Sequence, residues 1–188
     1  MRTNAVSSAK RTALLGALLA LSLGLSVAES MLGALVPVPI PGVKLGLANI
    51  VSMFLLCYFS LPTALTLALL RTLLASLFSG GLSMFLYSAP GALLSTLVMF
   101  AALKWLCPLS IVGVSMLGAV THNVAQVCVA VLTTGEVNLF YYAFILVAVG
   151  AVSGAITGVV ARLSFDRASG ALHIQGWRRK EYFHGGAL

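Results

Sequence analysis

The chain has 188 residues, of which 60% are hydrophobic and 8% are charged, and its mean hydropathy is +1.07. A soluble domain carries about a quarter charged residues because its surface must be hydrated, so this composition excludes an ordinary soluble protein. The formal net charge is +7, but no RNA- or DNA-binding motif accompanies the basic residues, and we expect no nucleic-acid partner. The composition predicts an integral membrane protein surrounded by the lipid bilayer.

Acidic side chains are too few and too scattered for metal-dependent catalysis. The four carboxylates are Glu29, Glu136, Asp166 and Glu181, and none lies near another in the sequence. Enzymes that bind diphosphates through Mg²⁺ need several carboxylates close together. The three cysteines form no C-x-x-C pair and are interpreted as small buried apolar residues. We therefore expect no catalytic residues, no metal site, no cofactor and no enzymatic activity.

Six apolar runs follow one another along the chain, each bounded by glycine, proline or charge. About 20 apolar residues are needed to cross the hydrocarbon core, and the runs cover residues 13–36, 45–59, 62–78, 84–105, 109–132 and 139–161. The sequence thus predicts an all-α integral membrane protein, a bundle of six transmembrane helices. Residues 1–12 would form an N-terminal segment, 13–161 the membrane domain and 162–188 a basic tail.

The basic residues are distributed unevenly about this predicted bundle. Six spans return both termini to the same side, and nine of the eleven Lys and Arg residues fall on that side. Lys44 falls on the opposite side, and Arg71 lies inside a span. The positive-inside rule therefore predicts that both termini are cytoplasmic.

The N-terminus also has an alternative interpretation. Basic residues, an apolar stretch and the small residues Ser26-Val27-Ala28 are typical of a cleaved secretory signal. Against this, the apolar run continues to Val36 and is long enough to span the membrane. Cleavage would leave the topology of the other spans unchanged.

Polar side chains inside the predicted spans fall mainly in the outer half of the membrane. Such groups are costly in hydrocarbon unless they face a cavity or a partner. At about 100° per residue, His122, Asn123 and Gln126 share one flank of a helix. We predict an outward-facing binding cavity with Arg71 near its floor, lined by Lys44, Asn49, Tyr87, His122, Asn123 and Gln126.

The alternative is that these polar residues only form hydrogen bonds between neighbouring helices. Arg71 would then pair with backbone carbonyls or with Glu29. In a binding site it would suit an anionic ligand, because guanidinium binds carboxylate and phosphate bidentately. Glu29 is a candidate partner for Lys44 or Arg71, or lies at the membrane interface.

Small residues recur every four positions in the first and last spans, a pattern that lets helices approach closely. In the last span the row runs from Gly150 to Gly158, and we expect it to pack within the bundle. In the first span, Ala9, Ala13 and Ala17 form one row. Gly16, Ala20 and Gly24 form a second row. This surface is larger than one neighbour needs, so it either receives a partner subunit or packs internally.

Four short motifs resemble a known family. They are residues 40–49 (IPGVKLGLAN), 70–74 (LRTLL), 85–88 (FLYS) and 118–126 (GAVTHNVAQ). Their order and spacing resemble the Gx transporter family, whose members are often labelled heptaprenyl diphosphate synthase component I. That family is similar to the substrate-binding S components of energy-coupling factor (ECF) transporters, and the resemblance covers about residues 10–162.

The resemblance implies a subunit of the bacterial cell membrane that captures a small micronutrient-like molecule, such as a vitamin, from outside. In such transporters an alanine motif on the first helix meets a membrane coupling subunit, and two ATPases drive transport. Ala9, Ala13 and Ala17 match that motif. The chain has no G-x-x-x-x-G-K-[ST] loop, so ATP hydrolysis is expected on another subunit.

Two other functions stay open at this point. One is a noncatalytic accessory protein in isoprenoid, quinone or flavin-based redox metabolism. A prenyl diphosphate synthase itself uses paired aspartate-rich Mg²⁺ motifs, which a chain with one aspartate cannot supply. The other is a carrier driven by an ion gradient, and the scarcity of intramembrane carboxylates counts against it.

Overall fold

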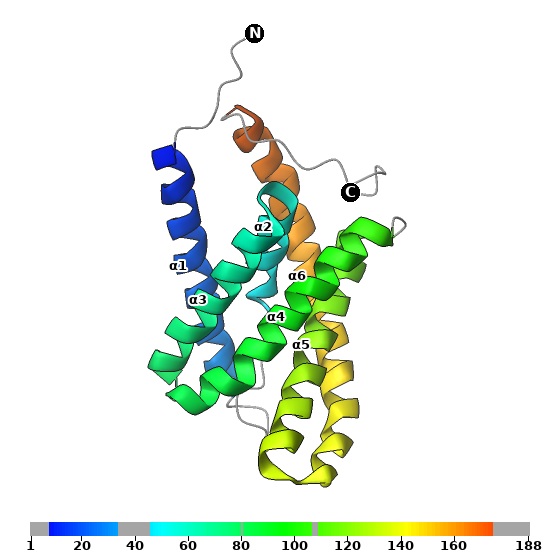
Figure 1. Cartoon of the computed structure of the whole chain (residues 1–188). Coiled ribbons are helices and arrows are strands. Elements are labelled where there is room, and N and C mark those ends of the chain that lie inside the picture. The colour runs from blue at the N-terminus through cyan, green and yellow to red at the C-terminus, as the bar shows by residue number, and fades with distance from the viewer. Residues whose placement is uncertain (1–7, 34–45, 80, 107–108, 175–188) are drawn as a thin grey trace.

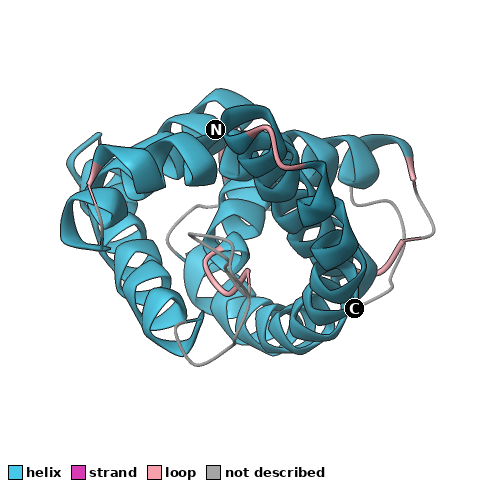
Figure 2. Ribbon diagram, turned by 90° about the horizontal axis from the view of Figure 1, so that it is seen from below, coloured by secondary structure: helices cyan, strands magenta, loops and turns pink. Residues whose placement is uncertain are grey.

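The structure is a computed structural model that describes residues 8–33, 46–79, 81–106 and 109–174. Within these ranges every regular element is helical: α1 (Ser8–Gly33), α2 (Asn49–Tyr58), α3 (Leu61–Ser79), α4 (Leu82–Trp105), α5 (Ile111–Thr134), the 3-10 turn η1 (Val137–Leu139) and α6 (Phe140–Ile174). The helices lie side by side in one bundle (Figure 1), and a view from below shows the same helical composition (Figure 2). The predicted all-α six-helix fold is confirmed.

Five of the described helices, α1, α3, α4, α5 and α6, are long and apolar enough to cross a membrane. The chain is therefore a multi-pass membrane protein. The helix α2 has 10 residues and is about 15 Å long, half the thickness of the hydrocarbon core. The apolar run predicted from Leu45 begins instead with a turn at Gly46, whose φ is +88°, so that regular helix starts only at Asn49.

The short helix α2 occupies the centre of the bundle. Eight of its ten residues are buried, and it contacts each of the five long helices. Leu55, Leu56 and Cys57 are at most 1% exposed. They belong to the main apolar core, which also includes Val114 of α5 and Ala161 of α6.

Glycines bring α5 and α6 into backbone contact. A Cβ atom at Gly154 would lie 2.6 Å from Cα of Met116, and one at Gly158 would lie 2.6 Å from Cα of Val112. Backbone atoms cannot move aside for an added methyl group, so only glycine permits this approach. The predicted internal packing of the glycine row is confirmed.

The helix α1 is the least embedded of the six. Within the described ranges it contacts α2 and α3 alone. Its small residues Ala9, Ala13 and Ala17 are exposed, and a Cβ atom at Gly16 or Gly24 would meet nothing within 4 Å. We call these five residues the small-residue face of α1. In the part of the chain that is described, nothing covers this face.

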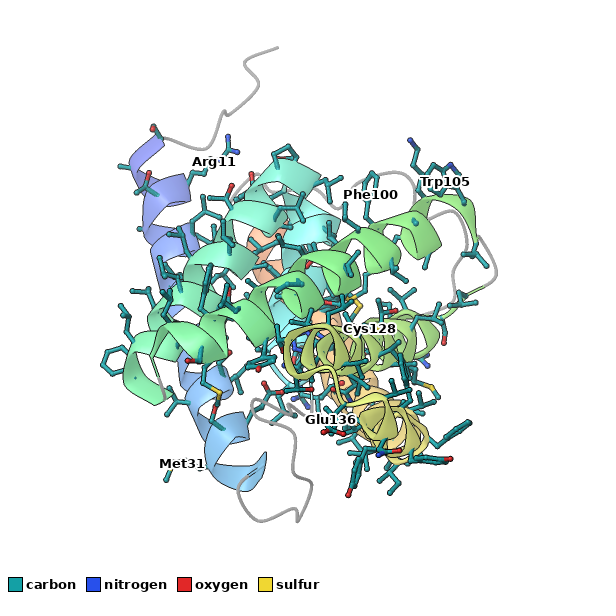
Figure 3. All side chains as sticks on the ribbon, turned by 60° about the horizontal axis from the view of Figure 1, so that its bottom comes forward. Arg11, Met31, Phe100, Trp105, Cys128 and Glu136 are labelled. Atoms are coloured by element: carbon teal, nitrogen blue, oxygen red, sulfur yellow. The ribbon has the colours of Figure 1, made fainter. Side chains whose placement is uncertain are left out.

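Charged and aromatic residues mark the two ends of the bundle. The start of α1 and the end of α6 lie at the same end (Figure 1). Arg11 and Trp105 lie toward that end, and Met31 and Glu136 toward the other (Figure 3). Lys104 Nζ is 5.3 Å from the centroid of the Trp105 ring, and such cation and aromatic groups collect at membrane interfaces. The cytoplasmic location of this end stays a prediction.

The last helix is longer than the apolar run that predicted it. The run ends at Ala161, whereas α6 has 35 residues and continues to Ile174. Its final turns carry Arg162 and Arg167, so the basic segment begins as helix. The residues after 174 lie outside the described part of the chain.

Candidate binding site

A buried polar stripe runs along the middle of α5. His122, Asn123 and Gln126 are 2%, 1% and 1% exposed. The stripe packs closely against α4 at Gly91. A Cβ atom there would lie 3.0 Å from the His122 carbonyl oxygen and 3.3 Å from Cγ of Gln126. His122 and Gln126 thus lie on one flank of α5, because both contact the same position of α4.

Asn123 is directed toward α6. Its Nδ2 donates a hydrogen bond of 3.0 Å to the carbonyl oxygen of Leu146. Its Oδ1 is buried and has no hydrogen-bond partner among the described residues. One half of this amide therefore holds α5 to α6, and the other half remains available to accept a hydrogen bond.

The turn before α2 brings Asn49 beside α5. A Cβ atom at Gly46 would lie 3.1 Å from Cβ of Ala119 and 3.4 Å from Nδ2 of Asn49. Ala119 is one helical turn before His122 and Asn123. Asn49 is 3% exposed, and its Nδ2 has no partner within the described ranges. The structure thus places Asn49 near Ala119, one helical turn from the polar stripe of α5.

Two charged residues complete this polar region from α1 and α3. Glu29 is 1% and Arg71 is 4% exposed. The Glu29 carboxylate accepts a hydrogen bond from the backbone N–H of Leu47, and it lies close enough to Arg71 to interact electrostatically. Nε of Arg71 is buried without a hydrogen-bond partner in the described chain. We call the full set the polar centre: Glu29, Asn49, Arg71, His122, Asn123 and Gln126.

The buried face of α1 was not predicted to belong to the site. Ser22, Ser26 and Glu29 are 3%, 1% and 1% exposed and follow one another at i, i+4 and i+7. These spacings place them on a single helix face. The same periodicity could have revealed this polar face in the sequence, where only Glu29 was considered.

The predicted site residue Tyr87 contacts an apolar cluster formed by α5 and α6. Tyr87 is half-buried and packs against the apolar cluster of Val127 and Leu146. Its hydroxyl group accepts a hydrogen bond of 3.1 Å from Thr133 near the end of α5. Tyr87 therefore lies with the α5–α6 hairpin. Lys44 lies outside the described residues.

The geometry defines a class of protein: a multi-pass helical membrane protein with a buried polar centre built from four helices. Among the described residues, no group of three or more His, Cys, Asp or Glu side chains could hold a metal ion. The family model described as heptaprenyl diphosphate synthase component I matches residues 18–164. The chain belongs to this family, as its motifs indicated.

The matched range contains every residue of the polar centre and begins after Ala9, Ala13 and Ala17. A search of curated proteins and a search of solved structures each gave no match. Further interpretation therefore depends on the chain's own residues.

Proposed function

We propose that the chain is the substrate-binding S component of an ECF-type ABC importer and captures a small micronutrient-like molecule from outside the cell. In this role it binds and releases its substrate without catalysing a reaction. The observation that carries the proposal is the polar centre. Polar groups at membrane depth are costly unless they face a cavity or a partner, and an enclosed polar ligand supplies that compensation.

The position of the polar centre along the helices favours entry from the end that carries Glu136. Glu29 lies four residues before the end of α1, and Asn49 is the first residue of α2. Gln126 lies eight residues before the end of α5, or about 12 Å from it. The positive-inside rule places this end outside the cell, which suits the capture of an external substrate.

The small-residue face of α1 supports the second half of the proposal, a partner in the membrane. Small residues at i and i+4 allow close helix packing, and this face is uncovered in the described chain. We propose that a membrane coupling subunit packs there and connects the chain to a pair of ATPases. This assignment rests on Ala9, Ala13 and Ala17, which precede the range matched by the family model.

The family description favours a second candidate, a noncatalytic membrane accessory protein in isoprenoid, quinone or flavin-based redox metabolism. The family is described as a component of heptaprenyl diphosphate synthase. In that role the chain would bind a soluble synthase or a redox protein. Of its described carboxylates, Glu29 lies in the polar centre and Glu136 at an exposed end of the bundle, so the pair does not form a metal-binding motif.

Affinity purification separates the two candidates. The tagged chain is extracted from its native membranes in mild detergent, and bound proteins and small molecules are identified by mass spectrometry. The importer proposal expects a multi-pass coupling protein, two ATPases and a retained small molecule. Recovery of a prenyl synthase or redox enzyme in their place would support the accessory role and contradict the importer.

A further inference from the structure

We infer that the polar centre recognises its ligand through an anionic group, a carboxylate or a phosphate, that binds the Arg71 guanidinium. This inference rests on the proposed function, because it names the class of molecule that the same site captures. Its first basis is the position of Arg71. Ala68, Thr72 and Ala75 are buried on α3, while Leu70 and Leu73 are exposed. Arg71, which is 4% exposed, therefore lies on the face of α3 that is directed into the bundle.

The second basis is that the protein does not fully compensate this buried cation. Glu29 acts on Arg71 electrostatically, but its carboxylate is also engaged elsewhere. The Glu29 carboxylate accepts a hydrogen bond from the backbone N–H of Leu47. Nε of Arg71 has no hydrogen-bond partner among the described residues. A buried charge is tolerated only when it is paired and hydrogen-bonded. The missing partner is supplied when an anion binds.

The third basis is the chemistry of the neighbouring atoms. Among the buried polar atoms that lack a partner in the described chain, Ser26 Oγ, Asn49 Nδ2 and Arg71 Nε come from the three helices α1, α2 and α3. Ser26 lies one turn before Glu29 on the buried face of α1, and Asn49 follows Leu47 by two residues. All three groups can donate a hydrogen bond. Ionised carboxylates and phosphates offer only acceptors, and guanidinium binds them through two parallel hydrogen bonds.

A cationic ligand fits this set less well. The carboxylate in the polar centre, Glu29, already accepts a hydrogen bond from the backbone N–H of Leu47. A cation would therefore add positive charge beside Arg71 and leave the three donors unsatisfied. The free Oδ1 of Asn123 suits a neutral donor elsewhere on the ligand.

Thermal unfolding with simple probes tests the anion site directly. The purified chain, depleted of bound molecules, is heated in detergent with inorganic phosphate, acetate or neutral acetamide, with sodium chloride added to equal ionic strength. We expect phosphate or acetate to raise the Tm more than acetamide does. The shift should persist in Glu29→Gln, vanish in Arg71→Gln and be reduced in Arg71→Lys, which keeps the charge but loses the planar fork. Equal effects of anions and acetamide, or an unchanged shift in Arg71→Gln, would overturn the inference.

Native mass spectrometry of the wild-type chain identifies the retained molecule, and this measurement does not require that a variant folds. We expect the molecule retained by the wild-type chain to contain a carboxylate or phosphate, and its mass distinguishes a soluble anion from a membrane phospholipid. Arg71→Gln should bind it about 30-fold more weakly or worse, the usual result of removing one partner of a buried charge pair. A retained molecule without an anionic group contradicts the inference. If the chain binds an anion but no transport subunits copurify with it, the importer proposal is contradicted and the inferred anion site is still supported.

Discussion

Two asparagines of the polar centre have opposite surroundings and should respond differently to substitution. Asn123 Nδ2 is bonded to the Leu146 carbonyl oxygen, whereas Asn49 Nδ2 has no partner among the described residues. We expect Asn123→Ala to lower the free energy of unfolding by about 1 kcal/mol through the lost hydrogen bond. Asn49→Ala should leave the stability of the ligand-free chain nearly unchanged and abolish ligand retention. Thermal unfolding and native mass spectrometry measure the two effects, and equal destabilisation by both variants would make Asn49 a structural residue.

The glycines of α6 and α1 form a second matched pair. Gly154→Ala would place a Cβ atom 2.6 Å from Cα of Met116, whereas at Gly24 nothing lies within 4 Å. Overpacking of this kind costs about 1–3 kcal/mol, so Gly154→Ala should lower the Tm. Gly24→Ala should maintain or raise it, because alanine favours the helix by up to about 1 kcal/mol. If both variants melted at the wild-type temperature, the close α5–α6 contact would be wrong.

At the residue scale, periodicity was a good guide where polar side chains interrupt apolar helices. It identified Asn49, Arg71 and the stripe from His122 to Gln126, which are all buried. It could not identify the backbone N–H of Leu47 as the partner of Glu29, because that contact depends on how the turn before α2 folds. It also could not identify Thr133 as the hydrogen-bond partner of Tyr87, since depth along a helix does not determine which neighbour a side chain contacts.

At the element scale, the uncovered surface of α1 leads to a prediction about assembly. Ala13→Trp places a large ring on the small-residue face and should prevent close packing of a coupling subunit. Ala13 is exposed, so the thermal stability and ligand retention of the isolated chain should be unchanged. Val159→Trp, at a 48% exposed position of α6, is the matched control. Copurification of the coupling subunit measures the effect, and equal recovery with both variants would exclude this face as the interface.

Hydropathy predicted all six helices but misjudged three of their ends: α1 begins at Ser8, before the run predicted from Ala13, and the start of α2 and the end of α6 also differ. The run from Leu45 gave no sign that Gly46 adopts φ +88°, because glycine is also tolerated inside membrane helices. Beyond Ala161 the chain becomes polar, and hydropathy cannot predict whether a polar segment continues as helix. Yet residues 162–169 contain no glycine or proline, so nothing ends α6 where the apolar run stops.

At the scale of the whole molecule, the charge distribution predicts which end faces the cytoplasm. Glu136 and Arg162 are both exposed and lie near opposite ends of the apolar span Val137–Phe165. In a variant with its native cysteines replaced by alanine, Glu136→Cys should react with a membrane-impermeant maleimide in intact cells. Arg162→Cys should react only after the cells are permeabilised. Mass shift of the purified protein reports the labelling, and the reverse pattern would invert the topology.

The hydrogen bond between Glu29 and the backbone of Leu47 has a mechanical consequence. The glycines of α6 leave little room for α5 and α6 to slide past one another. Among the described helices, α1 contacts only α2 and α3. Because the carboxylate joins α1 to the turn before α2, we expect that a ligand bound in the polar centre would displace α1 more than α5 or α6.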